Sequence, residues 1–110
     1  MKFGLRQRRA TKRTMAKYRL SRRAAIDLEA VAEYTIERFG IEQARRYREE
    51  LKACFDQLVS NPSMGRRAEQ LAHGLQRFEH QSHIVFYQRE ADGLLIVRVL
   101  HSRMDVPRHF

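Results

Sequence analysis

The chain has 110 residues, of which 43% are hydrophobic, and a formal net charge of +9 at pH 7. This length suits one domain with a modest core and excludes two domains of ordinary size. No apolar run approaches the ~20 residues that a transmembrane helix needs, so we expect a cytoplasmic protein without a membrane segment. The only cysteine, Cys54, cannot form a disulfide within the chain, and its helical pattern predicts a small buried side chain.

The positive charge is concentrated at the N-terminus. Residues 1–23 contain ten of the 22 Lys and Arg residues and none of the 13 acidic ones, whereas residues 24–110 have a net charge of −1. We expect residues 1–14 to be a basic leader without regular structure, or to precede a natural start at Met15. Residues 15–110 are expected to form a single domain. A basic leader can bind nucleic-acid phosphates without sequence preference, but the nearly neutral domain gives no reason to expect direct nucleic-acid binding.

The first predicted elements are a short strand at Lys17–Leu20 and a helix at Arg22–Phe39. Ser21 precedes the helix as an N-cap, because its hydroxyl can accept a hydrogen bond from an unpaired N–H of the first turn. Gly40 is expected to end the helix, since glycine adopts the positive φ of a C-terminal cap without steric strain. The residues that recur every three or four positions predict one buried helix face: Leu28, Val31, Ala32, Thr35, Ile36 and Phe39.

A second helix is predicted from Ile41 to the Asn61-Pro62 pair, where the proline ring ends it. Because a single glycine links the two helices, they are expected to form an antiparallel hairpin. The outer face of the second helix is dense with charge and is interpreted as a solvated surface. Its inner face carries Ala44, Tyr47, Leu51, Cys54, Phe55, Leu58 and Val59.

The last third of the chain has a hydrophobic period of two. It predicts three antiparallel strands, at Leu75–Phe78, His83–Arg89 and Leu94–His101. The last of them is apolar at almost every position, so we expect it to be the central strand, covered on both sides. The residues after Met104 are expected to be a polar tail with little structure of their own. The predicted fold is a two-layer α+β domain, in which an N-terminal strand and a helical hairpin pack on an antiparallel β-meander.

Several common chemistries are excluded by the motifs that the sequence lacks. There is no G-x-x-x-x-G-K-[ST] or G-x-G-x-x-G sequence, so we expect no nucleotide cofactor. The five histidines form no H-x-x-x-H pair and have no cysteine companions, so we expect no metal site. His80 and His83 flank the start of a strand, where we expect exposed side chains.

The end of the last predicted strand carries polar side chains that suggest chemistry. His101 and Arg103 lie on one side if the strand continues, and Asp105 follows them, whereas Ser102 points to the other side. A histidine and an arginine on one face can act as base and phosphate clamp in RNA cleavage. The alternative is a polar end of the sheet without catalysis, formed by Arg98, His101 and Arg103 paired with Asp105 or Glu79.

Four segments over residues 18–105 resemble the RelE/ParE toxin superfamily, in order and without large insertions. They are YRLSRRAAIDLEAVAEYTIERFG, ARRYREELKACFDQLVSNPSMGR, GLQRFEHQSHIVFYQ and LLIVRVLHSRMD. The most specific pieces are the Pro62-x-x-Gly65-Arg66 bend, Gly74-Leu-x-Arg77-Phe78 followed by Val85-Phe-Tyr87, and the terminal Val97-x-Val-Leu-His101-x-Arg103-x-Asp105. Together they are more similar to the ParE branch than to the RelE branch.

This resemblance implies the toxin of a bacterial type II toxin–antitoxin pair. ParE relatives poison DNA gyrase by stabilising its cleaved-DNA complex, and a ParD-like antitoxin neutralises them. We therefore expect a non-enzymatic toxin whose target-facing surface consists of Arg77, Arg98, His101, Arg103 and Asp105. For the antitoxin, the expected lining residues are Leu28, Val31, Leu51 and Phe55, with burial in the core as the alternative for each.

The RelE branch supplies the alternative function, because some nucleases of the superfamily use a Glu/Arg/His set. A ribosome-dependent mRNA endonuclease would here rely on His101 and Arg103, with Glu79 and Arg77 completing the catalytic set. RelE-type nucleases resemble one another in using lysines and a late tyrosine near the final strand. All four lysines of this chain precede the meander, and its last tyrosine is Tyr87, so the sequence favours the ParE interpretation.

Overall fold

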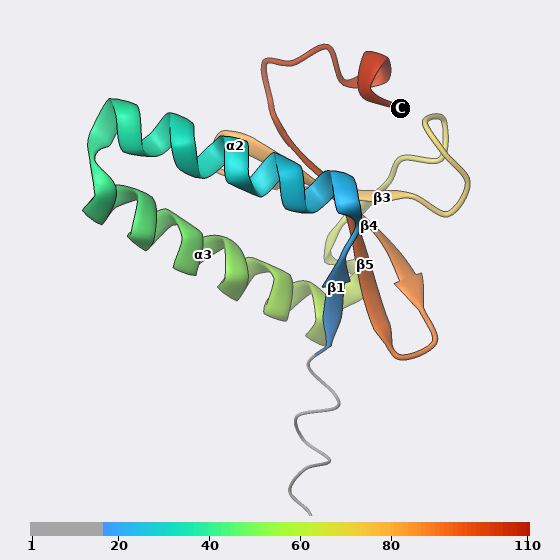
Figure 1. Cartoon of the computed structure of the whole chain (residues 1–110). Coiled ribbons are helices and arrows are strands. Elements are labelled where there is room, and N and C mark those ends of the chain that lie inside the picture. The colour runs from blue at the N-terminus through green and yellow to red at the C-terminus, as the bar shows by residue number, and fades with distance from the viewer. Residues whose placement is uncertain (1–16) are drawn as a thin grey trace, which may run out of the picture.

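The protein is described by a computed structural model over residues 17–110, and the predicted leader, residues 1–14, lies outside the described residues. In chain order the elements are β1 (Tyr18–Leu20), α2 (Arg22–Phe39), α3 (Ile41–Ser60), the 3₁₀ helix η2 (Pro62–Met64), β2 (Arg66–Arg67), β3 (Gln76–His80), β4 (His83–Glu90), β5 (Gly93–His101) and the 3₁₀ helix η3 (Val106–His109). The two helices run side by side and antiparallel along a five-stranded sheet (Figure 1). The predicted α+β fold is confirmed.

The helix boundaries follow from local signals in the sequence. The Ser21 side chain accepts a hydrogen bond from the Ala24 N–H at 2.9 Å, as expected of an N-cap. Gly40 has a φ of +92°, a conformation that favours glycine, and it forms the whole connection between α2 and α3. α3 ends directly before the Asn61-Pro62 pair. The predicted helical hairpin therefore forms with the predicted ends.

The sheet has the strand order β1-β5-β4-β3-β2. β3, β4 and β5 form the antiparallel meander, and β1 pairs with β5 in parallel, opposite Leu94–Ile96. The middle strand is β4, so the prediction that Leu94–His101 is the central strand is wrong. β5 is apolar at most positions because its side chains enter the hydrophobic cores on both faces of the sheet, with Ile96 in one core and Leu100 in the other. β2 was not predicted, because a two-residue strand shows no periodicity.

Each face of the sheet has its own hydrophobic core. On the helix-covered face, the first core joins Leu51, Phe55 and Leu58 of α3 to residues of β4 and β5 such as Val85 and Ile96. On the opposite face, the second core consists of Ala68, Leu75, Ile84, Phe86 and Leu100. No helix of the hairpin covers this second core. The segments that pack against it are irregular, and they include the loop before β3 and the C-terminal segment.

The C-terminal segment is ordered, so the prediction of a tail with little structure is wrong. Val106 begins η3 and packs against the second core. The ring of Phe110 meets the ring of Phe86 edge-on, with centroids 4.9 Å apart. The segment thus contacts the sheet through two apolar side chains that are separated by polar residues and give no regular pattern in the sequence.

Candidate functional site

A groove of about 550 Å³ opens between α2 and the C-terminal end of β5. Tyr34 on α2 and Met104 after β5 are 50% and 46% exposed, so a partner can contact both. The walls are largely apolar, with charged groups and histidines among them. The lining residues are Asp27, Ala30, Val31, Tyr34, His83, Val99, His101, Arg103 and Met104. Such a groove suits a segment that carries an apolar side chain and a few polar groups.

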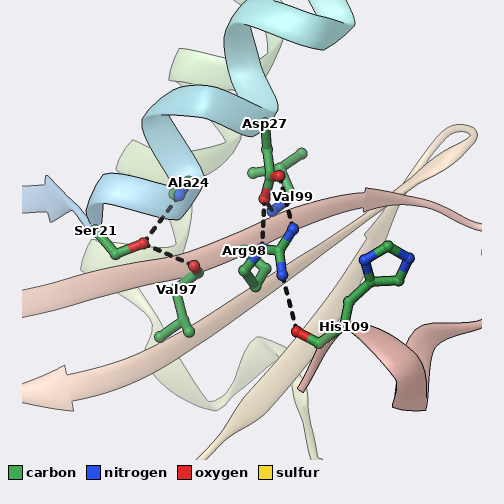
Figure 2. A network of polar contacts seen from close by, with 7 residues as sticks. All are labelled: Ser21, Ala24, Asp27, Val97, Arg98, Val99 and His109. Carbon is green, nitrogen blue, oxygen red and sulfur yellow. Dashed lines mark hydrogen bonds and ion pairs between the residues drawn. The ribbon is translucent and has the colours of Figure 1, made fainter.

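The wall of the groove depends on hydrogen bonds that complete the open edge of β5 (Figure 2). β1 covers β5 only as far as Ile96, which leaves the following backbone groups without a strand partner. The Ser21 hydroxyl donates to the Val97 carbonyl at 2.8 Å, and the Asp27 carboxylate accepts the Val99 N–H at 2.9 Å. Side chains at the start of α2 therefore take the place of a neighbouring strand.

Arg98 extends this network to the C-terminal segment (Figure 2). Its Nε and Nη2 donate to the two carboxylate oxygens of Asp27 at 2.8 and 2.9 Å, and its Nη1 donates to the His109 carbonyl at 2.8 Å. The side chains of Arg98 and Asp27 are only 8% and 11% exposed. The hydrogen bonds to Asp27 raise the pKa of Arg98 above its ordinary value. Arg98 is a structural link and does not lie on an exposed, target-facing surface as the sequence predicted.

Arg77 and Glu79 lie on the opposite face of the sheet from His101. In register they stand opposite Phe86 and Ile84, which belong to the second core. His101 stands opposite His83, which contacts Tyr47 of α3 on the helix-covered face. Residues paired across an antiparallel ladder share a face. The predicted nuclease set of His101, Arg103, Glu79 and Arg77 is therefore not brought together.

The rest of the predicted target-facing set divides into a pair and a separate residue. His101 and Arg103 line the same groove, and the Arg103 N–H donates to His101 Nδ1 at 3.0 Å. Asp105 is exposed and lies 3.9 Å from Arg108, so it does not pair with the residues of the strand end. Ser102 is exposed outside the groove, and its backbone N–H donates to the Ser82 carbonyl at 2.8 Å.

Three histidines form a row across the sheet beside the groove. His80, His83 and His101 occupy paired positions on β3, β4 and β5. His83 is only 8% exposed, contrary to the sequence-based expectation, and its Nδ1 lies 2.7 Å from the Tyr47 hydroxyl. Burial, together with the nearby His101 and His80, lowers the pKa of His83 to about 4, and burial raises the pKa of Tyr47 to about 12. Both groups are neutral at pH 7, so this is a neutral hydrogen bond, and the tautomer of His83 sets which of the two donates.

Known proteins with the same sequence pattern identify the family. Residues 18–106 match the family described as ParE toxin of the type II toxin–antitoxin system parDE. The chain belongs to the ParE toxin family. Toxin ParE1 of Caulobacter vibrioides is 42% identical over 95 residues, which cover 86% of this chain and 98% of that protein. Toxin ParE1 of Mycobacterium tuberculosis is 37% identical over 95 residues, covering 86% and 97%. Toxin ParE of Escherichia coli is 30% identical over 93 residues, covering 84% and 90%.

A solved structure agrees with this fold. A chain of the chromosomal ParDE toxin–antitoxin system of P. aeruginosa superposes with a TM-score of 0.66 at 18% identity, over 80% of this chain and 97% of that one. The family match and the three sequence relatives confirm the predicted resemblance to the ParE branch. The protein is a ParE-type toxin of a type II toxin–antitoxin system.

Half of the predicted antitoxin surface of this ParE toxin is inaccessible. Leu51 and Phe55 are 2% and 1% exposed and belong to the first core, so they cannot line an open surface. Leu28 and Val31 are half-buried at the seam between the helices, around a cavity of about 70 Å³. Of these four residues, Val31 alone also lines the open groove.

The motif pieces that carry the ParE resemblance before the last strand support the fold. The Tyr87 hydroxyl donates to the Pro62 carbonyl at 2.6 Å and accepts the Gly65 N–H at 3.0 Å. A Cβ atom at Gly65 would collide with that hydroxyl and with the Arg77 carbonyl, so only glycine fits. These contacts fasten the bend after α3 to the sheet.

Other kinds of site find no support in residues 17–110. They contain no group of three or more His, Cys, Asp or Glu side chains that could hold a metal ion. None of their helices is long and apolar enough to cross a membrane. Cys54 is buried in the first core, and burial raises the pKa of its thiol to about 11, which suits a core side chain rather than a nucleophile.

Proposed function

We propose that this ParE toxin binds DNA gyrase and stabilises the cleaved-DNA complex, without catalysing a reaction of its own. We further propose that it acts in the cytoplasm and that a ParD-like antitoxin neutralises it by covering the groove. The observation that carries this proposal is an accessible apolar groove that contains His101 and Arg103, whereas the other two residues of the predicted catalytic set, Arg77 and Glu79, lie on the opposite face of the sheet.

The charge of the groove supports a binding function. Within residues 17–110, Asp27 is the one carboxylate that lines the groove, and it is engaged by Arg98 and the Val99 N–H. Arg103 is exposed and forms no ion pair among residues 17–110. The groove therefore presents an available positive charge beside apolar walls. A partner segment with a carboxylate next to an apolar side chain would be complementary, because charge-assisted hydrogen bonds and apolar anchors dominate such interfaces.

The arrangement around His101 argues against mRNA cleavage. Because Nδ1 of His101 accepts the Arg103 N–H, the neutral ring carries its proton on Nε2. The ring then has no free acceptor with which to remove a proton from a 2′-OH, as a general base requires. The residues predicted to assist it, Arg77 and Glu79, face away across the sheet. We therefore favour binding over catalysis.

The test of the gyrase proposal is a supercoiling and cleavage assay with purified gyrase. We expect the full chain to inhibit supercoiling and to accumulate cleaved DNA, and Arg103→Glu to weaken both effects at least tenfold. The matched control is Arg45→Glu, which makes the same charge change at an exposed position of α3 outside the groove. No inhibition and no cleaved DNA at excess toxin would contradict the proposal, and cut mRNA in translating ribosomes would establish the RelE-like alternative.

The antitoxin proposal has a separate test. We expect Met104→Glu to lower the affinity for the proposed ParD-like antitoxin at least tenfold, because it places a charge in an apolar wall. Ile41→Glu is the matched control, since Ile41 is 58% exposed and lies at the tip of the helical hairpin, outside the groove. Equal affinities of the two variants, measured by calorimetry, would place the antitoxin elsewhere on the toxin.

A further inference from the structure

The row of His80, His83 and His101 holds α3 against the ends of three strands. The rings of His83 and His101 meet edge-on at 5.3 Å, and the ring of Tyr47 lies 5.8 Å from His80 and 5.5 Å from His83. One side chain of α3 thus contacts two of the three histidines. The groove begins at the same place, because His83 and His101 are among its lining residues.

The histidine row has few means of accommodating a proton. His83 is buried, and the buried Nε2 of His80 has no hydrogen-bond partner within residues 17–110. A proton on His83, the middle member of the row, adds a positive charge close to the rings of His80 and His101. Such a charge is costly in a buried site unless an anion faces it.

The two carboxylates around the histidine row form their hydrogen bonds with other side chains. Glu50 of α3 is exposed and accepts a hydrogen bond from Gln81 at 2.9 Å. Asp27, from α2, is held by Arg98, and none of the ion pairs within residues 17–110 includes a histidine of the row. The groups that face the row are Tyr47 and Glu50 from α3, Asp27 from α2, and Arg103 after β5.

We propose that the histidine row is a proton-sensitive joint: mild acidification loosens the contact between Tyr47 and the strand ends, and with it the floor of the groove. The joint is a property of the fold and does not depend on which macromolecule the toxin poisons. It makes the shape of the groove, and therefore binding at that surface, dependent on pH.

The sign of the effect follows from the lowered pKa of His83. In the unfolded chain His83 takes up a proton near its ordinary pKa of 6.5, whereas in the folded protein it does so only near 4. The stability that the folded protein gains from keeping His83 neutral is therefore fully present above pH 6.5. It is lost as the pH falls from 6.5 through 4. By this linkage, the equilibrium constant for unfolding is expected to rise roughly 30-fold between pH 8 and pH 5 on account of this one side chain.

The first experiment follows the histidine ring protons of the full chain by NMR as the pH is lowered. We expect His83 to titrate well below the exposed His73, which lies outside the row. Amide exchange over the same range should accelerate in the part of α3 around Tyr47 before it does so in β1 and its partner Leu94–Ile96. If His83 titrates together with His73, or if exchange accelerates uniformly, the proposal is wrong.

A second experiment compares urea unfolding at pH 8 and pH 5 in two matched variants. In His83→Gln, the amide can still form a hydrogen bond with the Tyr47 hydroxyl, as donor or as acceptor, but it cannot titrate, so we expect most of the 30-fold change to disappear. His73→Gln removes an exposed histidine and should behave as the wild type. The same pH dependence in both variants would overturn the proposal. If His83→Gln does not fold, the NMR titration of the wild type decides alone.

Discussion

The two faces of the sheet are built in different ways. On the helix-covered face, the first core is closed by two long amphipathic helices whose buried side chains recur in a regular pattern. On the other face, the second core is closed by irregular segments that contribute single side chains, such as Leu71 and Val106. The C-terminal segment adds one aromatic contact and one hydrogen bond from Arg98. The first face is therefore held by many cooperative contacts and the second by a few separate ones.

The difference between the faces explains where the groove lies. α2 crosses the sheet beside β5, and the groove opens where the strand ends and the helix continues. Asp27 and Arg98 join the helix to β5 and, through His109, to the segment that covers the second core. This link is the junction between the two faces. A partner in the groove would contact the helix-covered face beside it.

The largest expected effect is on the helix-covered face. Phe55→Ala removes a ring that is 1% exposed and meets Tyr18 edge-on with centroids 5.1 Å apart. Because helices close this face from outside, the cavity cannot collapse fully, and the loss should be about 3–5 kcal/mol of unfolding free energy. Urea unfolding at pH 8 measures it. A loss of less than ~1 kcal/mol would show that the first core is no more tightly held than the second.

The next effect is at the junction between the faces. Arg98→Met leaves the Asp27 carboxylate buried without its ion-pair partner, which should cost about 3 kcal/mol, near the lower limit for broken buried pairs. The double variant Asp27→Ala/Arg98→Met should lose less than the sum of the single variants, because it removes the unpaired charge. Additive losses in the double-mutant cycle would mean that the two side chains are not coupled.

A smaller effect is expected where the bend after α3 meets the sheet. Tyr87→Phe removes the hydroxyl that donates to Pro62 and accepts from Gly65. The half-buried Gly65 N–H is then unpaired, whereas the Pro62 carbonyl keeps the Gln76 side-chain amide as a donor at 3.3 Å. The expected loss is about 1–3 kcal/mol. Tyr34→Phe is the control, since Tyr34 is 50% exposed and its hydroxyl can bind water. If Tyr87→Phe and Tyr34→Phe are equally stable, the hydrogen bonds at this bend do not contribute to the stability of the first face.

The regular face could be predicted from the sequence, and the irregular one could not. Ser21, Gly40 and Pro62 act through local backbone geometry, so their neighbours alone reveal the helix ends. Nothing local to Phe110 indicates that it packs on Phe86, because that contact depends on the folded sheet. The predicted inner face of α2 was also too long: Ile36 and Phe39 are 42% and 66% exposed, because this end of the helix contacts neither core.

The candidate site was predicted in part for the same reason. His101 and Arg103 are two residues apart, and short spacing was enough to bring them together. From the sequence alone, Arg98 is expected at an exposed polar end of the strand. Its burial depends on an ion pair with Asp27, which lies 71 residues earlier in the chain. His83 was expected at the surface because its loop is short and polar, and only the position of Tyr47 on α3 explains its burial.

The smallest expected effect tests the weaker face directly. Phe110→Ala removes a ring that is 40% exposed and rests on Phe86, so we expect a loss of about 1 kcal/mol or less in unfolding free energy. Because the docked segment has few other anchors, the same change should accelerate amide exchange in residues 106–110 much more than in the helices. Met104→Ala is the control, since Met104 is 46% exposed and lies in the groove rather than on the second core. A loss as large as that of Phe55→Ala would mean that the irregular segments hold the sheet as firmly as the helical hairpin does, and that the two faces differ in pattern but not in strength.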